Sequence, residues 1–507
     1  MKQIKKITGV LLILAMIFTM SATAFAANTN AHTITITNDK AGHAYTAYQV
    51  FKGDISNGKL TNIEWGSGVN GADLLASLKG LSGSPYASCI SAEEVADVLM
   101  GFGNDSAELD EFAKIVGEHL SGTCNSSTEA ASSYTINVTG DGYYLVKDSG
   151  TIADNDAATK YILKVVGDVN VEAKSEVPSI DKIIVDADDT TGKGTAQDVG
   201  SSVSFKLTSA VPAMDGYSSY AYIVNDTLSA GLTFNNDVAV TIDGTEYTGF
   251  TVDQNGQSFT ITFNNFINQK TNAGKAIVIT YSATLNEGAL ATAKETNTVN
   301  LEYSNDPNNS ASMGKTPDKT VYVYDFDIVI DKWAEGENNT KEKLANAKFV
   351  LYKTDNNKNL YYFYNKTDKK VQWVELADNA AVAAAITAGT ITQVTTDANG
   401  AAKFQGLDSG TYYLHETEAP AGYNLLKRDV EITITATYGT DGQIVSCTAT
   451  STADGQYQKD QPIENKSGTL LPSTGGIGTT IFYIAGAVLV IAAGVLLVTR
   501  RRMNKNK

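Results

Sequence analysis

Residues that could carry out covalent or metal chemistry are few in this chain of 507 residues. The cysteines and histidines are Cys89, Cys124, Cys447, His32, His43, His119 and His415. Their scattered positions match no metal site, nucleophile elbow or phosphate loop, so we predict no metal, no cofactor and no enzymatic turnover. Three cysteines do not make a disulfide framework. Cys89 and Cys124 either pair with each other or remain free thiols.

The N-terminus has the pattern of an export signal. Three lysines precede an apolar run from about Val10 to Met20, and Ala24-Phe25-Ala26 follows as a small-x-small cleavage site. We therefore predict a signal peptide at residues 1–26, cleaved after Ala26. The apolar run is shorter than the ~20 residues that a membrane-spanning helix needs.

The C-terminus combines three signals in a fixed order. The chain reads Leu471, Pro472, Ser473, Thr474 and Gly475, then an apolar stretch from Thr479 to Val498, then three arginines. The stretch is long enough to span a bilayer, and the arginines would hold its end in the cytoplasm. This order resembles the sorting signal of sortase substrates: LPxTG, hydrophobic helix and basic tail. The resemblance implies that a membrane-bound transpeptidase cuts after Thr474 and transfers the threonyl group to an amine.

Between the ends, the sequence favours strands. It is 42% hydrophobic and contains 25 Tyr and 43 Gly, and Ile34 and Ile36 alternate with threonines as in a half-buried strand. Similar runs recur throughout, and turns such as Asp243-Gly244 and Asn255-Gly256 separate the strands. Helical patterns occur at Ser91 to Leu99, Glu108 to Leu120 and Leu376 to Thr387.

We therefore predict a mainly β protein with tandem immunoglobulin-like sandwich domains in a row, the first with helical insertions. The expected domains are residues 27–174, 175–318 and 319–467, followed by the sorting signal, transmembrane helix and basic tail at 468–507. The formal net charge of −17 disfavours nucleic acid as a partner.

The third domain contains the most specific motif. The chain reads Tyr413-Leu414-His415-Glu416-Thr417-Glu418-Ala419-Pro420-Ala421-Gly422-Tyr423, and this segment resembles the E-box of Cna B-type domains of pilins and adhesins, YxLxETxAPxGY. The strand ending at Lys332 and the segment Ile463-Glu464-Asn465 resemble the first and last strands of such domains. The resemblance implies an intramolecular isopeptide bond between Lys332 and Asn465, with Glu416 as the catalyst.

Burial explains why this chemistry is possible. A lysine among apolar residues has a lowered pKa and supplies a neutral amine, and a buried carboxyl group can donate a proton to the amide oxygen. Ammonia leaves, and the new bond would tie the first strand of the domain to the last without depending on redox state. The alternative for Lys332 is an ordinary exposed salt bridge.

The second domain repeats the pattern with an aspartate. The segments around Lys182, Asp226 and Asn297 resemble the Lys, Asp and Asn segments of Cna A-type pilin domains. Asn305 shares the strand parity of Asn297, so either asparagine could face the core. In the first domain an E-box-like segment has Lys147 where the third domain has Glu416, so we predict no such bond there.

A shaft subunit also needs an amine for polymerisation. In shaft pilins this amine is the lysine of a YPK-like motif at the end of the first domain, and Lys174 occupies that place, although Glu172-Ala173 replaces Tyr-Pro. The alternative is a plain linker lysine. Head-to-tail joining of Thr474 to Lys174 of the next identical subunit would build an open filament.

The resemblance implies a pilus shaft protein on the Gram-positive cell wall. Its expected partners are pilin-specific and housekeeping sortases, identical subunits, peptidoglycan, minor pilins and a host or surface receptor. The alternative is a singly wall-anchored adhesin or minor pilin built from the same domains. A wall-anchored enzyme is the least favoured hypothesis.

Overall fold

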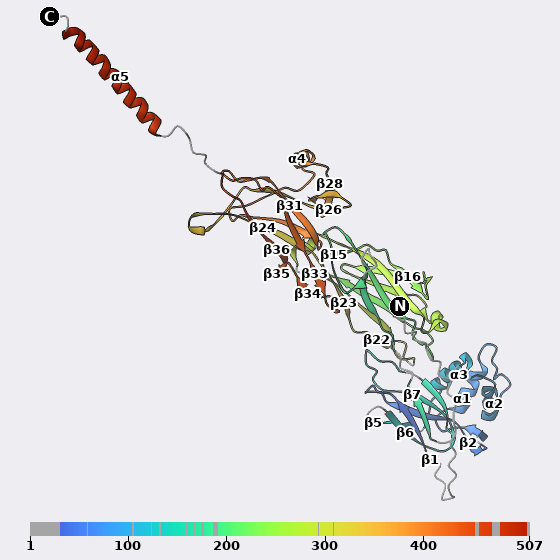
Figure 1. Cartoon of the computed structure of the whole chain (residues 1–507). Helices are drawn as coiled ribbons and strands as arrows, with labels where there is room; N and C mark the ends of the chain where they lie inside the picture. Colours follow the sequence, from blue (N-terminus) through green and yellow to red (C-terminus); the bar gives the residue numbers. More distant parts are fainter. Residues whose placement is uncertain are drawn as a thin grey trace, which may run out of the picture.

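The computed structural model shows three groups of β-sheets in a row and a long helix beyond the third group (Figure 1). The structure describes residues 31–503 except 58, 104–105, 123, 131–132, 159, 166–167, 174–176, 186–190, 293, 308, 452–455 and 469–476. We call the groups the first region (β1–β9), the second region (β10–β23) and the third region (β24–β36). The predicted fold class is confirmed.

The first region packs two sheets and three helices. The sheet orders are β5-β6-β1-β9 and β3-β2-β7-β8, with β4 paired to β2. The two predicted helices are confirmed as α2 and α3, which begin after capping serines, whereas α1 was not predicted. The elements are β1 (Ala31–Thr37), β2 (Tyr45–Ser56), β3 (Lys59–Trp65), α1 (Gly71–Lys79), α2 (Ala92–Met100), α3 (Ala107–Glu118), β4 (Asn125–Ser126), β5 (Thr128–Ala130), β6 (Ser133–Thr139), β7 (Gly142–Asp148), β8 (Lys160–Val165) and β9 (Val169–Glu172).

The second region is a sandwich of two sheets around an aromatic-rich core. Their orders are β11-β10-β13-β20-β16-β17 and β12-β23-β21-β14-β19-β18, with β15 on β20 and β22 on β21. Asp243 and Gly244 both have positive φ, as the predicted tight turn requires. The strands are β10 (Asp181–Val185), β11 (Thr191–Gly192), β12 (Gly194–Ala196), β13 (Ser202–Ala210), β14 (Tyr222–Leu228), β15 (Leu232–Phe234), β16 (Ala239–Ile242), β17 (Thr245–Glu246), β18 (Phe250–Asn255), β19 (Ser258–Phe263), β20 (Ala276–Leu285), β21 (Glu295–Ser304), β22 (Met313–Lys315) and β23 (Lys319–Tyr324).

The third region has sheets of order β25-β24-β36-β35 and β28-β27-β26-β31-β32, and a separate β33-β34 hairpin. Its first strand, β24, pairs in parallel with its last, β36. The predicted alanine-rich helix is α4. The elements are β24 (Phe326–Glu335), β25 (Lys341–Lys343), β26 (Lys348–Asp355), β27 (Lys358–Asn365), β28 (Lys370–Glu375), α4 (Asn379–Ala388), β29 (Val394–Thr395), β30 (Ala401–Leu407), β31 (Gly410–Glu418), β32 (Val430–Ile434), β33 (Ala436–Tyr438), β34 (Ile444–Cys447), β35 (Thr450–Ser451) and β36 (Tyr457–Glu464).

Strand β23 changes the expected division between the second and third domains. The predicted boundary at residues 318 and 319 assigns this strand to the third domain, but β23 pairs with β21 of the second region. Only Asp325 separates β23 from β24, so the chain passes from one sandwich to the next along nearly continuous strand. A composition-based boundary cannot detect such a junction, because no turn or linker marks it.

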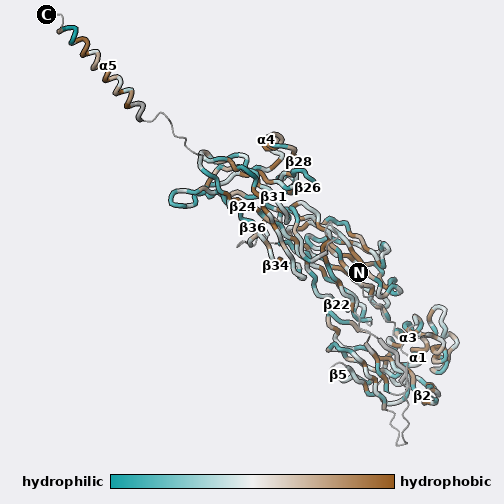
Figure 2. Tube along the Cα trace, in the orientation of Figure 1, coloured by the Kyte–Doolittle hydropathy of each residue, from teal (hydrophilic) through white to brown (hydrophobic). Residues whose placement is uncertain are grey.

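The C-terminal helix lies apart from the three regions. Helix α5 (Ile477–Met503) contains the predicted apolar stretch and ends with Arg500, Arg501 and Arg502. Figure 2 shows its apolar length and its hydrophilic end. The span Ile481–Met503 is long and apolar enough to cross a membrane and is not buried by any protein segment. These features fit the predicted transmembrane helix and its basic tail.

Candidate functional site

The third region brings Lys332, Glu416 and Asn465 together in its core. Lys332 Nζ donates a hydrogen bond to Asn465 Oδ1 over 2.5 Å and lies 3.1 Å from Glu416 Oε1. Asn465 Nδ2 donates to the same Glu416 oxygen over 2.9 Å. The amine, the amide and the carboxylate therefore contact one another in pairs, although they are far apart in the sequence.

Three strands determine these positions. Lys332 lies on β24 and pairs with Ile463 of β36. Asn465 is the residue directly after β36, and its backbone N–H donates a hydrogen bond to Trp333 O, which holds it beside β24. Glu416 lies on β31 in the opposite sheet, where Leu414 and Glu416 face the core and His415 lies on the other face. The side chains of Lys332 and Glu416 are both 0% exposed. Burial lowers the pKa of Lys332, although the charge of Glu416 opposes the shift.

The second region also brings a lysine, an acid and an asparagine together in its core, namely Lys182, Asp226 and Asn297. Lys182 Nζ donates to Asp226 Oδ2 over 2.8 Å and to Asn297 Oδ1. Lys182 is on β10, whereas Asp226 on β14 and Asn297 on β21 belong to the facing sheet. The rings of Phe205 and Tyr281 lie beside the ammonium group, each with its centroid 5.4 Å from Nζ. The cluster is closed off from water.

Burial changes the acid–base properties of this second cluster. It lowers the pKa of Lys182 to about 8, even though Asp226 opposes the shift through its charge and hydrogen bond. Burial also raises the pKa of Asp226, against the effects of Lys182 and Tyr281. Among the described residues, Asp226 Oδ1 has no hydrogen-bond partner, and this favours the neutral acid. Both shifts favour a neutral amine beside a protonated acid, the pair that nucleophilic attack on an amide needs.

Of the two candidate asparagines, the structure brings Asn297 to Lys182. Asn305 is also buried, as the shared parity predicts. It lies toward the first region, where its carbonyl accepts a hydrogen bond from Ala158 N and its side chain accepts from Ser312 Oγ. Strand register decides which asparagine lies near the acid, because Asn297 pairs with Leu228, and Leu228 is two residues from Asp226.

The structure also corrects the expectation that each bond would tie a first strand to a last one. This holds for the positions of Lys332 and Asn465, on and beside β24 and β36. In the second region, however, Asn297 is on β21, and β22 and β23 follow it.

Tyr281 also belongs to the second cluster, although no motif in the sequence indicates this. Its hydroxyl donates to Asp226 Oδ2 over 2.7 Å and accepts from Asn297 Nδ2 over 2.9 Å. Alternation along Ala276 to Tyr281 indicates only that this tyrosine faces the core. Its contact with two polar residues depends on how the sheets stack, which a strand pattern does not specify.

The first region contains a different buried cluster. Lys147 occupies the position that matches Glu416, and the next residue, Asp148, is buried. Asp148 Oδ2 contacts His43 Nδ1 at 2.5 Å, and Asp156 Oδ2 contacts His43 Nε2 at 2.8 Å. Burial alone would lower the pKa of His43, but its bonds to the two aspartates outweigh burial and raise the pKa to about 9.

Some of the predicted segments and residues are not part of these clusters. The signal peptide, Lys174, and Leu471, Pro472, Ser473, Thr474 and Gly475 lie outside the described residues. The three cysteines are free, with Cys89 buried and Cys124 exposed.

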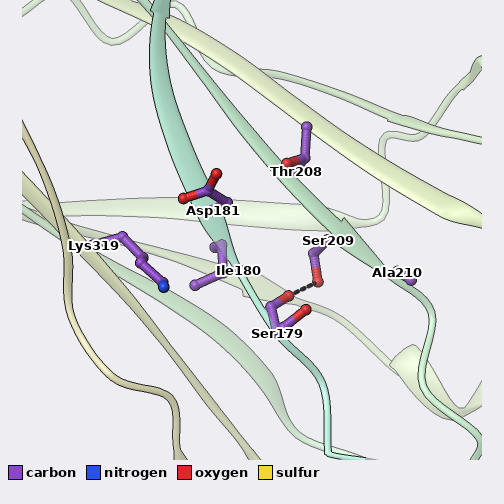
Figure 3. A pocket seen from close by; sticks show the side chains of 7 residues that line it. All are labelled: Ser179, Ile180, Asp181, Thr208, Ser209, Ala210 and Lys319. Carbon is purple, nitrogen blue, oxygen red and sulfur yellow. Dashed lines mark hydrogen bonds between the residues drawn. The ribbon is translucent and has the colours of Figure 1, made fainter. Parts of the chain in front are cut away.

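An open pocket lies on the outer side of β10. Figure 3 shows it lined by Asp181, Lys319 and residues of β13, with Ser209 donating a hydrogen bond to Ser179 O over 2.6 Å. Asp181 is exposed and Lys182 is fully buried, because consecutive strand residues face opposite sides. The pocket therefore gives no access to the buried cluster.

Comparison with known proteins gives three domain matches. Residues 332–452 match a SpaA-type prealbumin-like fold domain, and residues 463–505 match the LPXTG cell wall anchor motif. Residues 199–307 match the Cna-B-like domain of Gram-positive pilin backbone subunit 2. This last description differs from the Cna A-type resemblance expected for the second domain, and the matched residues begin after Lys182.

Two curated proteins and one solved structure are similar over much of the chain. The trypsin-resistant surface T6 protein of Streptococcus pyogenes serotype M6 is 26% identical, over 89% of this chain and 96% of the relative. Fimbrial subunit type 2 of Actinomyces naeslundii is 27% identical, over 67% of this chain and 63% of the relative. The T6 backbone pilin structure from S. pyogenes shares the fold with a TM-score of 0.50 and 20% identity, over 80% of each chain.

These matches agree with the β-sheet architecture of the second and third regions and with the predicted C-terminal sorting signal. None of the three similar proteins is named for an enzymatic activity, and the C-terminal motif with its apolar helix fits a protein anchored at the cell wall. The chain is therefore a surface protein built of pilin-type domains, similar to the trypsin-resistant surface T6 protein and carrying an LPXTG cell wall anchor.

Proposed function

We propose that this chain is the structural shaft subunit of a covalently polymerised pilus. Two intramolecular bonds, Lys182 to Asn297 and Lys332 to Asn465, stiffen each subunit, and sortase joins Thr474 of one subunit to Lys174 of the next. The observation that carries the proposal is the pair of buried clusters in which a lysine amine touches an asparagine amide beside a carboxylate.

Each cluster supports the same sequence of steps. The lysine gives a proton to the carboxylate, and the neutral amine attacks the amide carbon of the asparagine. A C–N bond to lysine forms, the C–N bond to the amide nitrogen breaks, and ammonia leaves. Two protons leave the lysine nitrogen: one reaches the departing nitrogen, and the other stays on the carboxylate or leaves with ammonia as ammonium. Each cluster reacts once, during maturation.

The two bonds explain how a shaft subunit could resist pulling. The linked positions are 115 and 133 residues apart in the chain, and a force along the filament would bypass both loops. Between the cross-links, the force would pass through residues 298–331, which include β22 and β23. This span, fully extended, measures at most about 120 Å at ~3.4 Å per residue. We therefore predict that a stretched subunit releases no more than this length between Lys182 and Asn465.

Polymerisation can be tested in a Gram-positive host that carries a pilin-specific sortase. The parent chain is expected to give a ladder of polymers that survive boiling in detergent, and Lys174→Ala is expected to give monomers only. The matched control is Lys366→Ala, which removes an exposed lysine of the third region. An unchanged ladder from Lys174→Ala would reject this linkage residue. A parent chain that forms only wall-attached monomers would favour the singly anchored adhesin.

A further inference from the structure

The carboxylates of the two clusters contact their asparagines differently. In the third region, Glu416 Oε1 accepts directly from Asn465 Nδ2 over 2.9 Å. In the second region, the amide nitrogen of Asn297 donates to the hydroxyl of Tyr281, and this hydroxyl donates to Asp226. A hydroxyl therefore stands between the acid and the nitrogen that would leave.

Strand register explains this gap. Asp226 pairs with Val299, and Leu228 pairs with Asn297, so Asp226 and Asn297 are diagonal neighbours on one sheet. Such neighbours are roughly 7–8 Å apart at their backbones, and an aspartate is one methylene shorter than a glutamate. Tyr281 reaches the space between them from β20 of the facing sheet.

The four side chains form a closed ring of hydrogen bonds in a dry core. Lys182 Nζ contacts Asp226 and Asn297, and Tyr281 joins these two residues from the other side. All four are at most 3% exposed. With water excluded, a proton that moves from Asp226 toward Asn297 Nδ2 has the Tyr281 hydroxyl as its path among the described side chains.

We propose that Tyr281 is a catalytic residue of the second cluster, which relays a proton from Asp226 to the departing amide nitrogen of Asn297. This inference rests on the proposed Lys182–Asn297 bond. Once Asp226 has taken a proton from Lys182, the Tyr281 hydroxyl turns its hydrogen from Asp226 toward Nδ2, and Asp226 Oδ2 donates to the tyrosine oxygen. When the carbon–nitrogen bond of Asn297 breaks, the hydroxyl gives its proton to Nδ2 and takes one from Asp226 Oδ2. Tyr281 ends unchanged, ammonia leaves, and Asp226 is ready to accept the second proton of the Lys182 nitrogen.

The test follows bond formation in the full chain made by cell-free synthesis and quenched in denaturant at timed intervals. Each bond lowers the mass by about 17 Da through loss of ammonia, and tryptic mapping assigns the bond to a region. Tyr281→Phe keeps the ring that stacks on Phe205 and removes only the hydroxyl. We expect it to slow formation of the Lys182–Asn297 bond by about 100-fold, the lower range of general acid–base effects. The Lys332–Asn465 bond of the same molecules is expected to form at the parental rate.

Tyr222→Phe is the matched control. Tyr222 is another buried tyrosine of this core, and its hydroxyl bonds to Ser209 instead of the cluster. It is expected to leave both rates unchanged. A parental rate in Tyr281→Phe, or equal slowing in Tyr222→Phe, would overturn the relay. Asp226→Ala tests the underlying bond separately. If the Lys182–Asn297 bond still forms in this variant, Asp226 is not the acid of the cluster, and the proposed chemistry of the cluster is rejected together with the relay.

Discussion

The second and third regions assemble the same three chemical groups from different strands. In the third region, lysine and asparagine lie on and beside neighbouring parallel strands, and the glutamate comes from the facing sheet. In the second region, aspartate and asparagine share one sheet, and the lysine comes from the other. The comparison teaches that the contacts of the amine with the amide and with the acid are kept while the strands that supply them are exchanged. The length of the acid is matched to this arrangement, since the shorter aspartate is accompanied by Tyr281.

The first region extends the comparison, because among its described residues no lysine amine contacts the side-chain amide of an asparagine; Lys40 Nζ reaches only the backbone oxygen of Asn155 and the carboxylate of Asp156. His43 instead holds the end of β7 to Asp156. The loop around Asp156 also contacts the second region, where Lys315 N donates to Asp154 O over 2.7 Å. The three regions thus contain a charge cluster around a histidine, a lysine–asparagine contact between sheets, and a lysine–asparagine contact within one sheet.

The largest effect is expected from removing an acid. Glu416→Ala should prevent the Lys332–Asn465 bond and leave the Lys182–Asn297 bond intact. By analogy with disulfides that close loops of more than 100 residues, the lost cross-link should lower the free energy of unfolding of the third region by about 4–5 kcal/mol. The unpaired buried lysine should lower it further. Calorimetry and peptide mapping measure both effects, and a bond that still forms would contradict the role of Glu416.

A change in pH should affect the first region specifically. The pKa of His43 is raised to about 9 from an ordinary value of 6.5. A raised pKa stabilises the fold below pH ~6.5, and this stabilisation is lost as the pH rises through 9. We expect a loss of about 3 kcal/mol, at ~1.4 kcal/mol per pKa unit.

Hydrogen exchange measured for each region between pH 6 and 10 can test this dependence on His43. His43→Gln is the matched variant, because its side chain is polar and does not titrate. If the parent and this variant lose protection in the first region equally as the pH rises, His43 is not the group responsible.

Shortening the acid of the third region should have a smaller effect. In Glu416→Asp the carboxylate is one methylene shorter, and no tyrosine hydroxyl joins Glu416 to Asn465 among the described contacts. We expect the Lys332–Asn465 bond to form about tenfold or more slowly, because a misplaced general acid is less effective. Timed mass measurement reports the rate, with the second region as the internal control. A parental rate would show that acid length is not matched to the strand arrangement.

The residues of the two clusters could be predicted from the sequence to different extents, and the reasons are physical. Glu416 belongs to a long motif whose positions are locally fixed, so it could be identified without knowing the sheets. The choice between Asn297 and Asn305 depended on register, since residues separated by an even number of positions face the same side. The contact of Tyr281 with Asp226 and Asn297 depends on how the two sheets stack. The assignment of β23 to the second region depends on strand pairing across a junction that no turn or linker marks. Alternation along a strand contains none of this long-range information.

The most direct test of the account is the intact mass of residues 27–474, followed by peptide mapping. Two bonds predict a mass about 34 Da below that of the sequence, with one peptide joining Lys182 to Asn297 and another joining Lys332 to Asn465. A mass equal to that of the unmodified sequence would contradict the account, because both clusters would then be ordinary buried ion pairs.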